Sequence, residues 1–199
     1  LRATSTPTGA NYSASLTGLS GGAKNYYIRC MDLAGNKNLD DYIISFTVPF
    51  IQTITLNQGW NLIGLTVGKG SNYLAEDFIK NLNSSFVPLP SRKGTPPVNK
   101  ITQIVKWDAS RGRYITHPQG SPSNNFPIVL GEGYFVISRW SGNSIISGTN
   151  TSLPSLAIPR GNSMISFPQL PSGVTTAENL LQSFQQQNIS VTQISRWFG

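Results

Sequence analysis

Alternating apolar and polar residues predict that most of this chain forms short β-strands. The alternation is clearest in residues 42–48, 51–56 and 134–138. A period of two directs one set of side chains to a core and the other set to solvent. Weaker versions of the pattern predict further strands at residues 26–30, 60–67, 101–107, 113–116 and 144–147. Gly, Ser, Asn and Asp gather between these segments, as is typical of turns. We therefore predict a mostly β fold.

Short helices are predicted at two places between the strands. Apolar residues four apart predict a helix over residues 73–82. Glu76 lies near the positive end of this helix, where a carboxylate is stabilising. Thr175 and Glu178 have the spacing of a capping box, which predicts the start of a second helix. Both glutamates are therefore assigned structural roles.

The two helices belong to a longer internal repeat. Gly59 of GWNLIGL aligns with Gly161, and the motif AEDFI aligns with AENLL, both at an offset of 102 residues. Trp107 of ITQIVKW aligns with Trp197 of VTQISRW at an offset of 90, so the first copy holds 12 more residues between helix and strand. A repeat of this length indicates tandem domains.

The repeat divides the chain into three predicted parts. Residues 50–149 are expected to form one complete β module with a short helix, and residues 150–199 the N-terminal half of a second copy. Residues 1–49 differ from both copies and are expected to be the C-terminal strands of a sandwich domain. We expect the chain to be a window on a longer protein, or its missing strands to come from a partner chain by β-augmentation.

The first part resembles a known class of domain. The segment YSASLTGLSGGAKNYYIRCMDLAGN, followed by YIISFTV, resembles the last three strands of a fibronectin type III or bacterial immunoglobulin-like domain. The resemblance implies an extracellular spacer or adhesion module in which Tyr26 makes the tyrosine-corner hydrogen bond. Cys30 shares a predicted strand face with Tyr26, so we expect it to be a small buried residue.

The remaining parts resemble another class of module. The ordered motifs GWNLIGL, AEDFI, ITQIVKW and FPIVLGEGYFVI resemble a module found in tandem in large bacterial and archaeal surface proteins. The resemblance covers residues 54–148 and, in truncated form, 153–199. It implies a structural or adhesive context outside the cell, and it implies no reaction and no catalytic residue.

Several glycines and tryptophans in these motifs have structural explanations. Gly64 lies inside a predicted strand, where a glycine marks a bulge or lets another backbone approach closely. The remaining structural assignments are turns at Gly59, Gly131 and Gly133, and packing within the strand pattern at Trp107 and Trp197.

The composition favours an extracellular location. Only 12% of the residues are charged, about half the usual share, and Ser, Thr, Asn, Gly and Pro fill the gap. No apolar run approaches the roughly 20 residues needed to span a bilayer. Cys30 is the single cysteine, so no disulfide forms within this stretch. Glycosylation is left open at the sequons of Asn11, Asn83, Asn150 and Asn188.

Much of the net charge of +7 lies in one basic cluster. Its members are Arg92, Lys93, Lys100, Lys106, Arg111 and Arg113. A basic cluster of this kind is able to bind a polyanion, such as an acidic cell-wall polymer. A solvated loop and strand surface explains the same residues, and we favour that interpretation. Nucleic acid is not an expected partner.

Residue types for catalysis or metal binding are scarce. His117 is the only histidine, and the sequence places no base-orienting partner beside it. Zinc needs several His or Cys ligands, and the chain holds one of each. We therefore predict no enzyme activity, no cofactor and no metal site. The exposed aromatics are candidates for a sugar-binding platform, although packing explains them too: Trp60, Trp107, Tyr114, Tyr134 and Trp140.

The sequence thus predicts a non-catalytic structural or adhesive segment of a large secreted surface or filament-forming protein. Its expected partners are neighbouring domains, other copies of itself, or a cell-wall polysaccharide or other polyanion. Two alternatives remain: a carbohydrate-binding accessory region of a secreted polysaccharide-degrading enzyme, and a polyanion-binding surface module. The candidate contact residues are Trp60, Tyr114, Trp140, Arg92, Lys93, Lys100, Arg111 and Arg113.

Overall fold

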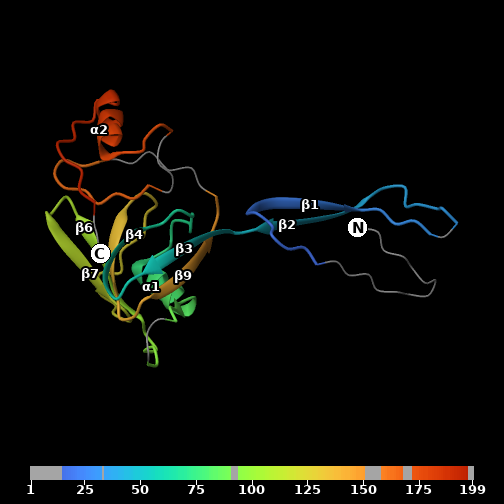
Figure 1. The fold of residues 1–199 in the computed structure, drawn as a ribbon, viewed down its shortest axis with the longest axis horizontal. Coiled ribbons are helices and arrows are strands. Elements are labelled where there is room, and N and C mark those ends of the chain that lie inside the picture. The colour runs from blue at the N-terminus through green and yellow to red at the C-terminus, as the bar shows by residue number, and fades with distance from the viewer. Residues whose placement is uncertain (1–14, 33, 91–93, 151–157, 168–171, 197–199) are drawn as a thin grey trace. The chain divides into compact units, whose positions relative to one another are not determined.

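The computed structural model describes residues 15–32, 34–90, 94–150, 158–167 and 172–196 (Figure 1). Over these residues the fold is mostly β, with three antiparallel sheets and two helices, which confirms the predicted fold class. The chain divides into two compact units, residues 1–50 and 51–199. The second unit includes both the complete module and the second copy that the repeat predicts.

The first unit is built on a two-stranded antiparallel sheet. Its strands are β1 (Gly22–Ile28) and β2 (Tyr42–Val48). The Tyr26 ring stacks on the Phe46 ring, with centroids 5.7 Å apart. Large apolar side chains remain exposed, including Tyr42, which is 70% exposed. The tyrosine-corner hydrogen bond and the immunoglobulin-like identity stay predictions.

The expectation that Cys30 is buried is wrong. Strand β1 ends at Ile28, and Cys30 is exposed in the connection that follows. The Cys30 N–H donates to the Asn38 side-chain oxygen at 2.6 Å. The two-stranded sheet leaves most of its own side chains exposed, so a residue just beyond β1 has no core to enter.

The second unit contains a three-stranded and a four-stranded sheet. The three-stranded sheet has the order β3 (Phe50–Leu56), β9 (Gly142–Gly148) and β5 (Val87–Pro88). The four-stranded sheet has the order β4 (Gly59–Gly64), β8 (Gly133–Ser138), β6 (Ile101–Asp108) and β7 (Arg113–Pro118). Helix α1 (Ala75–Ser84) contacts both β6 and β9, so it packs against both sheets.

The core of the second unit lies around α1. Phe78, Ile79 and Leu82 on the predicted helix stripe are fully buried. One face of the four-stranded sheet meets the core, because its alternate residues Tyr134 and Val136 are also fully buried. The opposite face of this sheet is partly open to solvent.

Both helix starts differ slightly from the sequence prediction. Helix α1 begins at Ala75 rather than residue 73, because Leu74 is still extended and forms a β-bridge. Helix α2 (Ala177–Gln186) is capped by Thr176, whose hydroxyl accepts the Asn179 N–H at 3.1 Å. The predicted capping box of Thr175 and Glu178 is therefore one residue out of register and wrong.

The predicted strand at residues 191–197 is not formed over residues 191–196. Its counterpart in the first copy, β6, is paired on one side with β8 and on the other with β7. No ladder partner lies beside residues 191–196 within the described parts of the chain, so the strand pattern has nothing to pair with. Trp197 lies outside the described residues.

Replacing Phe78 by Ala should lower the free energy of unfolding of the second unit by about 3–5 kcal/mol, because it leaves a cavity between the sheets. Urea titration followed by tryptophan fluorescence measures this unit alone, since all four tryptophans lie in residues 51–199. Val87→Ala is a suitable control, because Val87 is 61% exposed. Equal stability losses in the two variants would contradict the described core.

Candidate functional site

Residues 158–167, here called the docking segment, lie against the four-stranded sheet of the second unit. The segment lies across a notch in the four-stranded sheet, which we define by Gly64, Trp107 and residues 131–133. The indole N–H of Trp107 donates to the Asn162 carbonyl at 2.7 Å. Trp107 therefore holds the docking segment through a hydrogen bond as well as through packing.

Backbone hydrogen bonds join the docking segment to the strand edge. The Gly133 N–H donates to the Met164 carbonyl at 3.0 Å, and the Ser166 N–H donates to the Gly131 carbonyl at 2.8 Å. These two bonds close an antiparallel β-bridge between the copies. Strand β4 ends at Gly64. Beyond this point, the docking segment pairs with Glu132 and so continues the sheet.

The notch requires glycine. A Cβ on Gly64 would lie 2.0 Å from the Ser166 hydroxyl oxygen and 2.1 Å from the Ser166 Cβ, which is a clash. Gly131 has a φ of 92°, in the left-handed region that favours glycine. Gly133 sits in ordinary contact with Met164, at 3.5 Å from its backbone. The GEG motif therefore forms a receptor for another segment as well as a turn.

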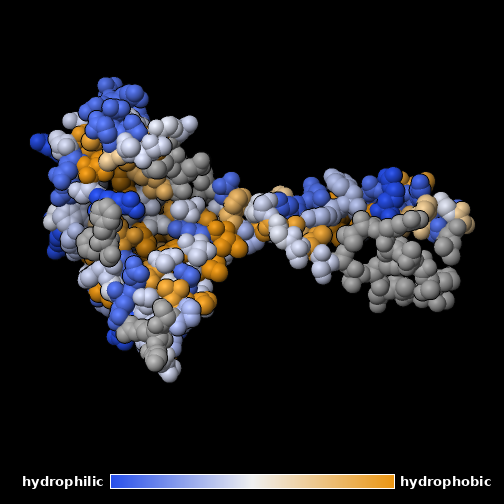
Figure 2. All heavy atoms as spheres, viewed as in Figure 1, coloured by the Kyte–Doolittle hydropathy of each residue, from blue (hydrophilic) through white to orange (hydrophobic). Residues whose placement is uncertain are grey.

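Helix α2 covers the docking segment from the other side. The Phe184 ring of α2 packs against the Phe167 ring, with centroids 6.5 Å apart, and Phe184 is buried. Figure 2 shows apolar surface directly beneath α2, where the docking segment meets the sheet. Sheet, docking segment and helix therefore form one packed stack.

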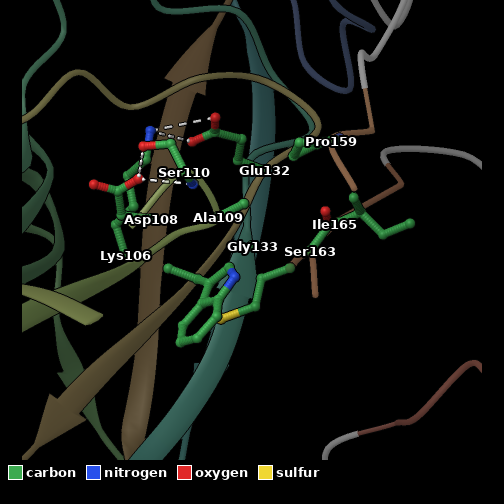
Figure 3. Close-up of a pocket in the computed structure, with 11 residues that line it drawn as sticks. Lys106, Asp108, Ala109, Ser110, Glu132, Gly133, Pro159, Ser163 and Ile165 are labelled. Carbon is green, nitrogen blue, oxygen red and sulfur yellow. Dashed lines mark hydrogen bonds and ion pairs between the residues drawn. The ribbon is translucent and has the colours of Figure 1, made fainter. Parts of the chain in front are cut away.

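A cleft of about 280 Å³ opens beside the notch (Figure 3). Several of its polar groups are engaged with one another, whereas the buried Ser163 hydroxyl has no hydrogen-bond partner within the described residues. Lys106 pairs with Glu132 at 3.0 Å, and the same carboxylate accepts the Tyr134 hydroxyl at 2.7 Å. Burial raises the pKa of the Tyr134 phenol, so Tyr134 stays a donor to Glu132. Across the cleft, Asp108 accepts the Ser110 hydroxyl at 2.6 Å. The two carboxylates that line the cleft are therefore held by ion-pair and hydrogen-bond partners of their own.

The aromatic candidates separate into exposed and buried residues. Trp60 and Tyr114 are 45% and 55% exposed on the open face of the four-stranded sheet. The Phe135 ring lies between them, 6.0 Å from Trp60 and 6.3 Å from Tyr114. Trp140 and Tyr134 are buried, so neither belongs to a surface platform. Trp140 follows the end of β8, where strand alternation no longer determines its direction.

The predicted basic cluster is brought together only in part. Lys100 precedes β6, and Arg113 pairs with Asp108 at the far end of β6, so roughly 25 Å of strand separates them. Lys106 is paired with Glu132, and Arg111 is paired with Asp108 at 3.1 Å. Arg92 and Lys93 lie outside the described residues. Among the described members, Lys106, Arg111 and Arg113 thus lie toward one end of β6, and Lys100 precedes its other end.

His117 has a partner that sequence reasoning missed. Its ring is fully buried, and its Nε2 lies 3.0 Å from a Glu76 carboxylate oxygen. Its Nδ1 lies 2.9 Å from the Ser123 carbonyl. Glu76 also accepts the Gly120 N–H at 2.8 Å. These contacts fasten the loop after β7 to the first turn of α1. Glu76 is 41 residues away in sequence, so no local motif could reveal the pair.

Glu76 is ionised in this setting. Its partial burial opposes ionisation, but the hydrogen bonds from Gly120 and His117, with Lys80 nearby, outweigh that cost and lower the pKa of Glu76. We assigned Glu76 a structural role at the start of α1. Its carboxylate has a second structural role, because it also anchors His117. The fully buried His117 imidazole, engaged at both nitrogens, thus links β7 and the loop after it to α1.

The sequons differ in their surroundings. The Asn83 side chain accepts the N–H groups of Lys100 and Ile101 and donates to the Ile101 carbonyl, so it fixes the start of β6. Asn150 and Asn188 are exposed, and Asn11 lies outside the described residues. Asn83 is therefore a structural residue, and an attached sugar would break its three contacts.

Comparison with known protein families, with characterised proteins and with solved structures gave no match to this chain. Within the described residues, no three His, Cys, Asp or Glu side chains gather as a metal site would require. Neither helix in the described parts has the length and apolar character to cross a membrane. Function must therefore be argued from the notch and the open sheet face.

Replacing Glu76 by Gln should destabilise the second unit by about 1–3 kcal/mol at neutral pH, because it removes a charged acceptor from a buried histidine. The folded-state pKa of Glu76 lies below its ordinary value of 4.5. The carboxylate therefore contributes stability that is complete above pH 4.5 and is lost as the pH falls through the folded-state pKa. Urea unfolding across this range should show the difference between wild type and variant shrinking on acidification.

Glu178→Gln is the matched control, since Glu178 occupies the same helix position in the second copy. The Glu178 carboxylate accepts an exposed hydrogen bond from the Gln182 amide at 3.3 Å. We expect a change within about 0.5 kcal/mol. Equal effects of the two substitutions at neutral pH would contradict the anchoring role of Glu76.

Proposed function

We propose that this chain is a non-catalytic structural and adhesive segment of a secreted surface protein, built from modules that interlock. The observation that carries this proposal is the docking segment in the notch. Modules joined only by a flexible linker move independently. Here, two backbone hydrogen bonds, the Trp107 bond and the close approach at Gly64 fix the second copy on the first.

Local geometry supports the proposed repeat. Gly59 and Gly161 have φ values of 100° and 101°, so both copies turn in the same way at the aligned glycine. Helices α1 and α2 each have ten residues, and their first residues are 102 positions apart, which is the offset of the aligned glycines. A repeated, interlocking unit is suited to building an extended rigid array.

The composition supports a surface location. A chain that is 12% charged and rich in Ser, Thr and Asn presents an uncharged hydrogen-bonding surface. The buried state of His117 supports a non-catalytic function, because both of its nitrogens are engaged within the fold. The partners proposed for the notch are neighbouring modules of the same chain or other copies of it.

The proposed location is tested with antibodies raised against residues 51–199. Intact cells of the source organism should be labelled as strongly as lysed cells, because a surface protein is accessible without lysis. Label that appears only after lysis would contradict the proposal.

Replacing Gly64 by Ala should release the docking segment, because the added Cβ occupies the space of Ser166. Hydrogen exchange of the Gly133 and Ser166 amides measures this release, since both N–H groups bond across the notch. We expect exchange at both amides to become at least about tenfold faster, equivalent to about 1.4 kcal/mol of lost protection. The Val136 amide, within β8, should keep its protection and serves as the internal control.

A second substitution tests whether the effect is steric. Ser166→Gly in the Gly64→Ala background removes the clashing side chain and should restore slow exchange at the Gly133 amide. Unchanged exchange in the single variant, or no recovery in the double variant, would show that the two residues do not meet in solution.

A further inference from the structure

The open face of the four-stranded sheet carries no charged residue. The strand registers place Trp60, Gln103, Tyr114, Thr116, Phe135 and Ile137 on this face. The remaining positions of the same face within β4, β6, β7 and β8 are also uncharged. In a chain of net charge +7, an uncharged face over four strands excludes a polyanion as the natural occupant.

Three rings cross this face in a row, on three of the four strands, with β6 lying between the strands of the last two rings. Trp60 on β4, Phe135 on β8 and Tyr114 on β7 have successive centroid spacings of 6.0 and 6.3 Å. Neighbouring rings are inclined by 83° and 64°, so they meet edge to face and do not form one plane. Trp60 and Tyr114, at the two ends of the row, are the most exposed of the three.

The face is continuous with an interface that is already occupied. At the end bearing Gly64 and Gly133, the docking segment covers the sheet. The rest of the face, around Trp60 and Tyr114, is open. Exposed apolar surface of this kind, next to an established contact, marks a second contact surface.

We propose that the open part of this face, centred on Trp60, Phe135 and Tyr114, binds an uncharged polysaccharide chain. The proposal rests on the adhesive function proposed above and names its partner. Aromatic faces pack against the C–H surfaces of sugar rings, and Gln103 and Thr116 offer an amide and a hydroxyl to sugar hydroxyl groups. Apolar rings with a few uncharged polar groups are the recognition chemistry of a neutral glycan.

The test is retention of the purified full chain on insoluble cellulose, chitin, starch and β-1,3-glucan, measured by depletion from solution. We expect retention on at least one of these polymers. Trp60→Ala and Tyr114→Ala should each weaken it by about tenfold or more, as expected for truncation of a central contact residue. Tyr114→Phe keeps the ring and should retain most of the binding.

Tyr42→Ala is the matched control, because Tyr42 is 70% exposed and belongs to the first unit rather than to this sheet. It should leave retention unchanged. An unaltered unfolding midpoint for each variant shows that the loss comes from the surface and not from the fold. Because Trp60 and Tyr114 are both exposed, neither substitution removes a core contact.

Three outcomes would overturn the proposal. The first is no retention on any of the four polymers. The second is retention that neither Trp60→Ala nor Tyr114→Ala weakens. The third is a dimer of the chain that Trp60→Ala and Tyr114→Ala dissociate and Tyr42→Ala does not. The last outcome would identify a second copy of the chain as the occupant. None of them affects cell-surface labelling or amide exchange at the notch, so failure here is distinguishable from failure of the structural function.

Discussion

The close approach of Ser166 to Gly64 is the constraint on which the described arrangement of the two copies depends. No side chain fits at Gly64, because the Ser166 side chain occupies the position of a Cβ. That proximity lets Gly133 and Gly131 bond to the docking segment. Helix α2 then packs on the docking segment through the contact between Phe184 and Phe167. The missing side chain at Gly64 thus lets the docking segment pack directly on the four-stranded sheet.

The interior of the first module is organised around a different link. His117 connects the loop after β7 with the first turn of α1, through Glu76 and the Ser123 carbonyl. His117 and Tyr114 are an odd number of residues apart on β7, so their side chains lie on opposite faces of the sheet. The His117 link therefore lies on the face opposite the open aromatic face. Buried polar contacts therefore hold one face rigid, while the other face remains available for partners.

The strands and α1 could be predicted closely from the sequence because their signals are local. Alternation and helical spacing depend on neighbouring residues only. The pair of His117 and Glu76 could not be predicted, because the partners are 41 residues apart and on different elements. The burial of Trp140 was missed because it lies beyond the end of a strand, where periodicity stops. Gly64 gave the one useful signal for the notch, since glycine inside a strand indicates close approach.

The rigid joint between the copies is tested most directly by ¹⁵N relaxation of the full chain. A docked second copy requires the amides of β8 and of α2 to report the same rotational correlation time, because they then belong to one body. A clearly shorter correlation time for α2 than for β8 would show that the second copy moves freely. That result would contradict interlocking, and with it the structural function built on the notch.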